Sequence, residues 1–80
     1  MPRQSDLIKQ EKRRRALFMG HFFDCRSAPN EQRKNRAIEE MAKLAKTFEE
    51  WSYIHIWATP GSEPAKRAIK EMLIISGQAA

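Results

Sequence analysis

The sequence predicts an all-α fold, a compact three-helix domain with helices over residues 6–24, 31–57 and 63–76. Proline occurs only before, between or in the first turn of these segments, where it does not break a helix. In the middle segment, apolar residues recur at spacings of three and four, which is typical of an amphipathic helix. The eighty residues therefore make one small helical domain, with a basic N-terminal helix or arm over residues 1–26.

The first predicted helix begins near Ser5 and Asp6, which suit a helix N-terminus because one supplies a capping oxygen and the other an acid. Up to Asp24 the chain is rich in good helix formers. The break that follows contains Pro29, which cannot continue the helix, and Asn30, which suits the cap of the next one. The sequence therefore predicts a turn between the first two helices.

The second predicted helix carries a clear apolar stripe, formed by Ala37, Met41, Leu44, Phe48 and Trp51. Residues 51–57 fit two structures. Their aromatic and β-branched side chains suit a strand, whereas the stripe itself runs on into them. Continued helix is favoured, and an α+β fold with a short strand at 51–57 is the alternative.

The third predicted helix follows a turn at residues 59–62. Ser62 is expected to cap it, Pro64 occupies the first turn, and Gly77 is expected to end it. Its residues 67–72 match residues 36–41 at five of six positions, 31 residues apart. Two copies do not establish a repeat protein, so both segments are interpreted as ordinary amphipathic helices.

All of the net positive charge lies in the first 36 residues. They contain ten Lys and Arg against four acids, a net charge of +6, whereas residues 37–80 carry −1. A folded domain has no internal need for such a split, so the basic half is expected to face an anionic partner.

The run Lys12-Arg13-Arg14-Arg15 is the strongest functional signal. On a helix these residues wrap around the axis, which suits contacts with phosphates on several sides. The predicted nucleic-acid-binding residues are Lys9, Lys12, Arg13, Arg14, Arg15, Arg26, Arg33, Lys34 and Arg36. A helix-turn-helix register over residues 40–57 is rejected because no polar recognition helix follows its turn.

A second interpretation uses the aromatic segment as a binding surface for another protein. Its predicted interface residues are Trp51, Tyr53, Ile54 and Trp57. No basic residue lies between Lys46 and Lys66, so this segment lacks the charge that base stacking on nucleic acid normally accompanies.

The sequence gives little support for a metal site or for catalysis. His21, Asp24 and Cys25 lie within one helical turn, but a zinc site needs three or four ligands and no fourth is near in sequence. No catalytic residue, metal ligand or cofactor is therefore predicted. A single cysteine fits a reducing, cytoplasmic setting, and no apolar run is long enough to span a membrane.

These observations predict a small, non-enzymatic nucleic-acid-binding or regulatory protein, such as an accessory protein of a phage or plasmid. DNA and RNA both remain open as the partner, and so does an acidic protein surface. The alternative is an inhibitor or adaptor that binds through residues 51–57. A homodimer would relieve the shortage of core in so short a chain.

Overall fold

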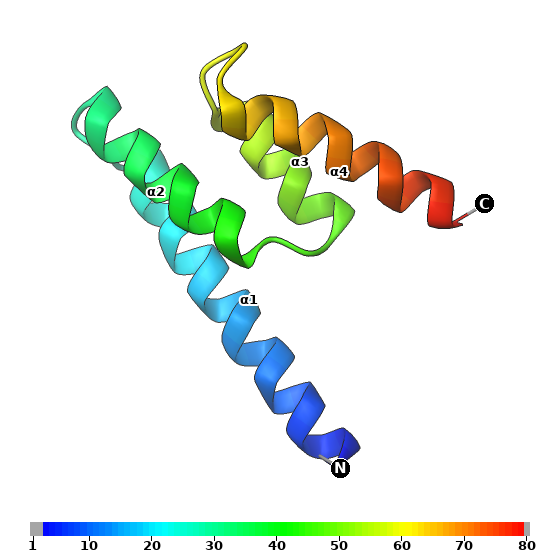
Figure 1. The fold of residues 1–80 in the computed structure, drawn as a ribbon. Coiled ribbons are helices and arrows are strands. Elements are labelled where there is room, and N and C mark those ends of the chain that lie inside the picture. The colour runs from blue at the N-terminus through cyan, green and yellow to red at the C-terminus, as the bar shows by residue number, and fades with distance from the viewer. Residues whose placement is uncertain (1–2, 80) are drawn as a thin grey trace.

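The computed structural model describes residues 3–79, and over that range it contains four helices and no strand: α1 (Gln4–Arg26), α2 (Glu31–Leu44), α3 (Phe48–Trp57) and α4 (Glu63–Ala79). Helices α1 and α2 form one antiparallel hairpin, and α3 and α4 form a second (Figure 1). The second hairpin packs against α2, and α3 also contacts α1. The all-α class is confirmed, whereas the count of three helices and the strand at 51–57 are wrong.

The predicted helix over residues 31–57 is divided by a short turn at Ala45–Thr47. A capping box causes the division. The Thr47 hydroxyl accepts a hydrogen bond from the backbone N–H of Glu50 at 3.1 Å, and the Glu50 carboxylate accepts one from the N–H of Thr47 at 3.1 Å. This reciprocal pair satisfies two backbone donors at the start of α3 and favours a new helix there.

The other helix ends differ from the predicted ones by a few residues. Asn30 caps α2 as predicted, because its side chain accepts a hydrogen bond from the backbone N–H of Arg33 at 2.9 Å. The prediction for Ser62 is wrong, since its hydroxyl is buried and makes no hydrogen bond. Gly77 does not end α4, which continues to Ala79, because one glycine weakens a helix without breaking it. At the other end, α1 already begins at Gln4.

The core lies where the two hairpins meet. Phe18 and Phe22 of α1, Ile38 and Met41 of α2, and Ile54 of α3 are its largest aliphatic and phenyl side chains, each at most 8% exposed. Helix α4 contributes mainly small residues to this core. Phe48, which the apolar stripe placed inside, is 48% exposed because the turn at 45–47 changes the direction of the chain just before it.

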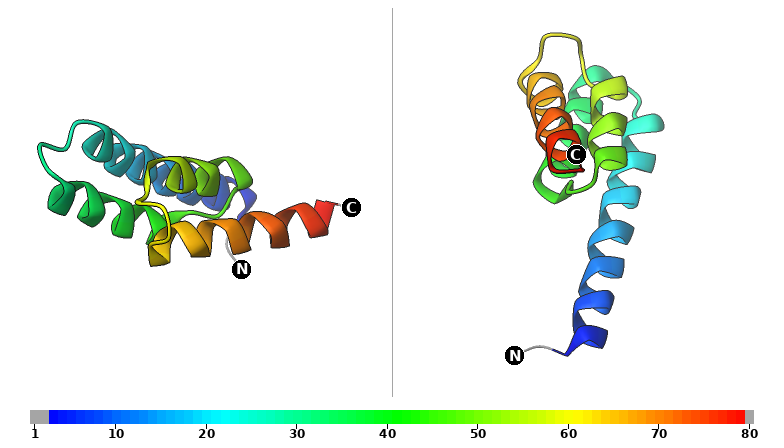
Figure 2. Two further views of the ribbon diagram at one scale, coloured as in Figure 1. Left: turned by 90° about the horizontal axis from the view of Figure 1, so that it is seen from above. Right: turned by 90° about the vertical axis from the view of Figure 1, so that its right-hand side faces the viewer.

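The molecule is thin and extended. Its Cα atoms span 42 × 29 × 15 Å, and its radius of gyration is 13.6 Å. A compact chain of this length has a radius of gyration of about 12 Å. Figure 2 shows the cause: the N-terminal half of α1 and the C-terminal half of α4 both project beyond the body of the two hairpins.

Candidate nucleic-acid interface

The orientation of α1 divides the basic run into two groups. Phe18 and Phe22 face the body of the molecule. Successive helical residues are 100° apart, so Arg14 lies on that inner side whereas Arg13 lies on the outer side. The side chain of Arg14 is accordingly only 11% exposed, and Lys12 and Arg13 are exposed.

The inner arginines meet a fully buried carboxylate, Glu50 of α3. Arg14 Nη1 donates to Glu50 Oε1 at 2.8 Å, and Arg15 Nη1 donates to Oε2 at 3.0 Å. The backbone N–H groups of Lys46 and Thr47 donate to Oε1 at 2.9 and 3.1 Å. A buried charge is stable only when it is paired and hydrogen-bonded, and this one has two cations and two backbone donors.

The charge state of Glu50 follows from these contacts. Burial by itself would raise the pKa of the carboxyl group, because it disfavours the ionised form. The hydrogen bonds from the Lys46 backbone, Arg14, the Thr47 backbone and Arg15 outweigh burial and lower the pKa of Glu50 to about 2. Glu50 is therefore ionised at neutral pH and holds α1 against the start of α3.

Arg14 and Arg15 are thus structural residues. Arg14 also donates to the backbone carbonyl of Leu44 at 2.8 Å and pairs with Glu11 at 3.1 Å, and Arg15 pairs with Glu49. The prediction that both contact phosphates is revised, because their guanidinium groups are already occupied within the chain. Sequence reasoning also missed Glu50, although the T-x-x-E capping-box pattern singles it out.

Two further predicted cations have partners in the structure. Lys34 pairs with Glu31 one turn earlier at 3.1 Å and is half-buried. The guanidinium of Arg26 lies 5.7 Å from the ring centre of Phe22 and 6.0 Å from that of Phe23. Cation–π contacts of this kind hold an exposed arginine only weakly, so Arg26 keeps its charge available to a ligand.

Five predicted cations are exposed and have neither an ion pair nor a cation–π contact with any residue in the described part of the chain: Lys9, Lys12, Arg13, Arg33 and Arg36. Lys9 and Arg13 are one turn apart on the outer face of α1, and Lys12 lies between that face and the inner one. Arg33 and Arg36 lie in the first half of α2. The five cations come from the two helices of one hairpin.

A polar groove lies along one flank of this hairpin. Arg33 and Arg36 line it from α2, together with His21 and Asp24 from α1. A neighbouring hollow on α1 shares His21 and Asp24 and extends to Arg13. The exposed cations of this hairpin that lack partners form a discontinuous positive surface, which we call the basic flank: Lys9, Lys12, Arg13, Arg33 and Arg36.

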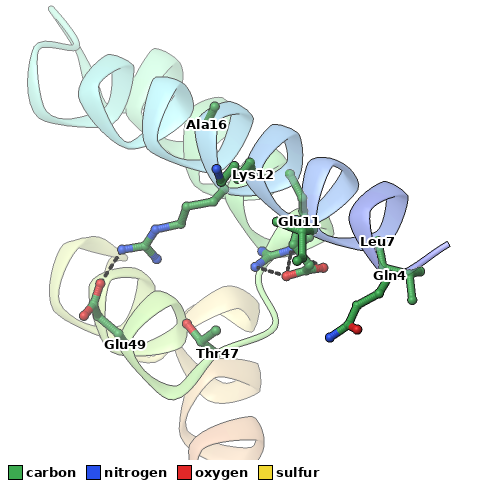
Figure 3. Close-up of a pocket in the computed structure, with 10 residues that line it drawn as sticks. Gln4, Leu7, Glu11, Lys12, Ala16, Thr47 and Glu49 are labelled. Atoms are coloured by element: carbon green, nitrogen blue, oxygen red, sulfur yellow. Dashed lines mark hydrogen bonds and ion pairs between the residues drawn. The ribbon is translucent and has the colours of Figure 1, made fainter.

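A second groove lies on the opposite side of α1, between its projecting half and the start of α3 (Figure 3). Leu7 and Ile8 line it, and they are about half exposed. Thr47 and Glu49 form the other wall. This groove continues the inner face of α1 past the point where the body of the molecule ends, and it holds none of the basic flank except Lys12 at its rim.

The aromatic segment is largely part of the core. Trp51 is 2% exposed and Ile54 is fully buried, so neither presents a surface to another protein in this fold. Tyr53 is half-buried and stacks on Phe22 with 4.7 Å between the ring centres. Only Trp57, at 37% exposure, remains accessible among the four predicted interface residues.

Helices α2 and α3 are joined by a three-residue turn, yet α3 does not suit the role of a recognition helix. Its exposed side chains include an acid, Glu49, and an apolar residue, Ile56, and α3 contains no Lys or Arg. A recognition helix reads base edges and phosphates with polar and basic side chains. Helix α3 therefore lacks the side chains of a recognition helix.

The described residues contain neither an assembled metal site nor a reactive thiol. No group of three or more His, Cys, Asp or Glu side chains is placed to hold a metal ion within residues 3–79. Cys25 is 2% exposed, and burial raises the pKa of its thiol, so it packs as a small apolar residue. None of the helices described is both long and apolar enough to cross a bilayer.

The fold and its charged surface define a small all-α domain of two helical hairpins with a basic flank on the first. Comparison with known proteins finds no matching family model, no matching curated protein and no matching solved structure.

Proposed function

We propose that this chain is a small, non-enzymatic nucleic-acid-binding protein that contacts backbone phosphates through the basic flank. The observation that carries the proposal is the placement of Lys9, Lys12, Arg13, Arg33 and Arg36, all exposed and unpaired within residues 3–79. Unpaired cations on one flank cost folding energy through mutual repulsion, and binding to an anionic polymer offsets that cost.

The shape of α1 supports the same proposal. The N-terminal half of α1 projects beyond the body of the molecule (Figure 2). Lys9, Lys12 and Arg13 belong to this half and are exposed, so a phosphate backbone can approach them from solvent. Asp24 and Glu40 lie in the groove beside Arg33 and Arg36, and they repel phosphate there. The projecting half of α1 is therefore the main contact, and the arginines of α2 extend it.

Binding that depends on phosphate contacts is expected to weaken steeply with salt. On duplex DNA, the logarithm of the affinity falls with the logarithm of salt concentration by about 0.9 for each contact. Changing Lys9, Lys12 and Arg13 together to Gln should weaken binding to all sequences and flatten that slope by up to about three units. Fluorescence anisotropy with duplex DNA, single-stranded DNA and duplex RNA measures both effects.

The matched control changes Lys43, Lys66 and Lys70 to Gln. These exposed lysines lie outside the basic flank, and their replacement removes the same three charges. We expect this control to retain most of the affinity and the salt slope. Equal losses in the two triple variants would mean that net charge alone drives binding, and no binding by the parent protein to any of the three probes would refute the proposal.

A further inference from the structure

Helix α4 has an apolar strip that the chain leaves uncovered. Its inward face is formed by Ala65 and Ala68, which are buried, and by Met72, which is half-buried. Next to this face lie Ile69 and Leu73, one turn apart, with exposures of 45% and 69%. We call Ile69 and Leu73 the α4 strip.

The internal sequence match relates the α4 strip to a buried part of α2. Residues 36–41 and 67–72, which match in sequence, lie in the second helix of each hairpin, α2 and α4. Counting 31 residues on, Ile38 corresponds to Ile69 and Ala42 to Leu73. Ile38 and Ala42 are 1% and 9% exposed, because α2 is packed against three helices. Helix α4 packs against only α2 and α3, so its corresponding side chains remain in solvent.

The total exposed surface shows how much area a partner would have to cover. The chain exposes 5991 Å². A compact monomer of 9.3 kDa exposes about 5000 Å² by the usual scaling with mass. The excess of about 1000 Å² is shared by the projecting halves of α1 and α4 (Figure 2) and exceeds the roughly 800 Å² that each subunit buries in a stable protein–protein interface.

Charge decides which part of the surface can meet a second copy of the chain. Contact between two N-terminal halves would bring two regions of net charge +6 together, whereas residues 37–80 carry only −1. Within α4, no residue after Glu71 is charged. Two copies can therefore approach through α4 with little repulsion, and both basic flanks stay exposed.

We propose that the α4 strip is a homodimer interface, in which α4 packs antiparallel against α4 of a second copy across a two-fold axis. The strip is self-complementary in this arrangement: Ile69 meets Leu73 of the second copy, and Leu73 meets Ile69 of the second copy. The same register places Lys70 level with Met72 and Lys66 level with Ser76, and it places Glu71 level with Glu71 of the second copy at the two-fold axis. Glu71 lies about 180° around the helix axis from the strip, so these two carboxylates point away from the contact. The α3–α4 hairpins of the two copies then form a four-helix arrangement.

The test compares two substitutions on the same helix. Leu73→Glu places a charge in the strip and should raise the dimer dissociation constant by roughly 30-fold or more, as for a central interface residue. Ile74→Glu is the matched control: Ile74 is 45% exposed, but it lies about 100° around the helix axis from Leu73. It should change the dissociation constant by about twofold at most. Sedimentation equilibrium over a wide range of protein concentration measures both values.

A cysteine pair gives an independent readout that does not depend on affinity. Leu73→Cys and Ile69→Cys in separate copies, mixed and oxidised, should form a disulfide-linked heterodimer, whereas Ile74→Cys with Ile69→Cys should not. Circular dichroism verifies that each variant stays folded, which is expected because all three positions are exposed. A monomeric parent protein, assemblies larger than a dimer, or stronger dissociation by Ile74→Glu than by Leu73→Glu would each overturn the proposal. None of these outcomes bears on nucleic-acid binding.

Discussion

Glu50→Gln is expected to lower the free energy of unfolding by roughly 3–5 kcal/mol, as when one partner of a buried ion pair is removed. The substitution keeps the size of the side chain but removes the charge that Arg14 and Arg15 contact at 2.8 and 3.0 Å. It also replaces one acceptor oxygen by a donor amide beside these guanidinium groups. Small domains have a total stability of only about 5–15 kcal/mol, so much of the variant should unfold at moderate temperature.

The neighbouring residue provides the control. Glu49 also pairs with Arg15, but its side chain is 57% exposed. Exposed ion pairs contribute about 0–1 kcal/mol, so Glu49→Gln should have little effect on stability. Chemical denaturation followed by circular dichroism compares the two. Equal, small losses would mean that Glu50 does not hold α1 to α3.

The same carboxylate makes stability depend on acid pH. The pKa of Glu50 is about 2 in the folded protein, below the ordinary value of 4.5. A group whose pKa is lowered by folding stabilises the protein above its unfolded-state pKa, and this stabilisation is lost as pH falls toward the folded-state pKa. The parent protein should therefore lose stability between about pH 5 and pH 2. Glu50→Gln should show a flatter dependence over that interval.

Phe18→Ala is expected to destabilise the fold by roughly 3–5 kcal/mol, the usual cost of removing a buried phenyl ring. Phe18 is fully buried and lies 6.5 Å from Tyr53 between ring centres, so its loss leaves a cavity where α1 meets α3. Thermal unfolding followed by circular dichroism measures the effect.

Phe48→Ala is the informative comparison for this core substitution. The apolar stripe in the sequence predicts Phe48 in the core, whereas the structure leaves it 48% exposed. The structure therefore predicts a loss below about 1 kcal/mol, as for most surface substitutions. A loss as large as that of Phe18→Ala would place α3 in a different register against α1.

The contacts of Glu50 also show why replacing all three arginines of the basic run would be a misleading test of phosphate binding. By helix propensity alone, changing Arg13, Arg14 and Arg15 together to Ala would leave α1 intact, because Ala is a good helix former. Two of these residues hold Glu50, so the triple variant should unfold and lose binding for that reason. Among these three arginines, Arg13 is the one whose replacement tests the proposed phosphate contact, because it is exposed and lies on the outer side of α1.

Local sequence determined much of this protein. The helical class, the turns at Pro29 and Pro60 and the cap at Asn30 follow from backbone chemistry that acts over a few residues. So does the division of charge between the two halves of the chain, which is a property of composition. The capping box at Thr47 was also present in the sequence, but the apolar spacing that continues through it masked the break.

The tertiary structure alone decided which charges and apolar residues face solvent. Arg13 and Arg14 are adjacent and chemically identical, and only the direction of α1 relative to α3 separates an exposed cation from the partner of a buried carboxylate. Ile38 and Ile69 occupy matching positions in similar segments, and only the number of helices around each separates a buried side chain from an exposed one. These differences depend on contacts between separate helices, such as the pair of Arg14 and Glu50, which are 36 positions apart, and helical periodicity carries no information about such contacts.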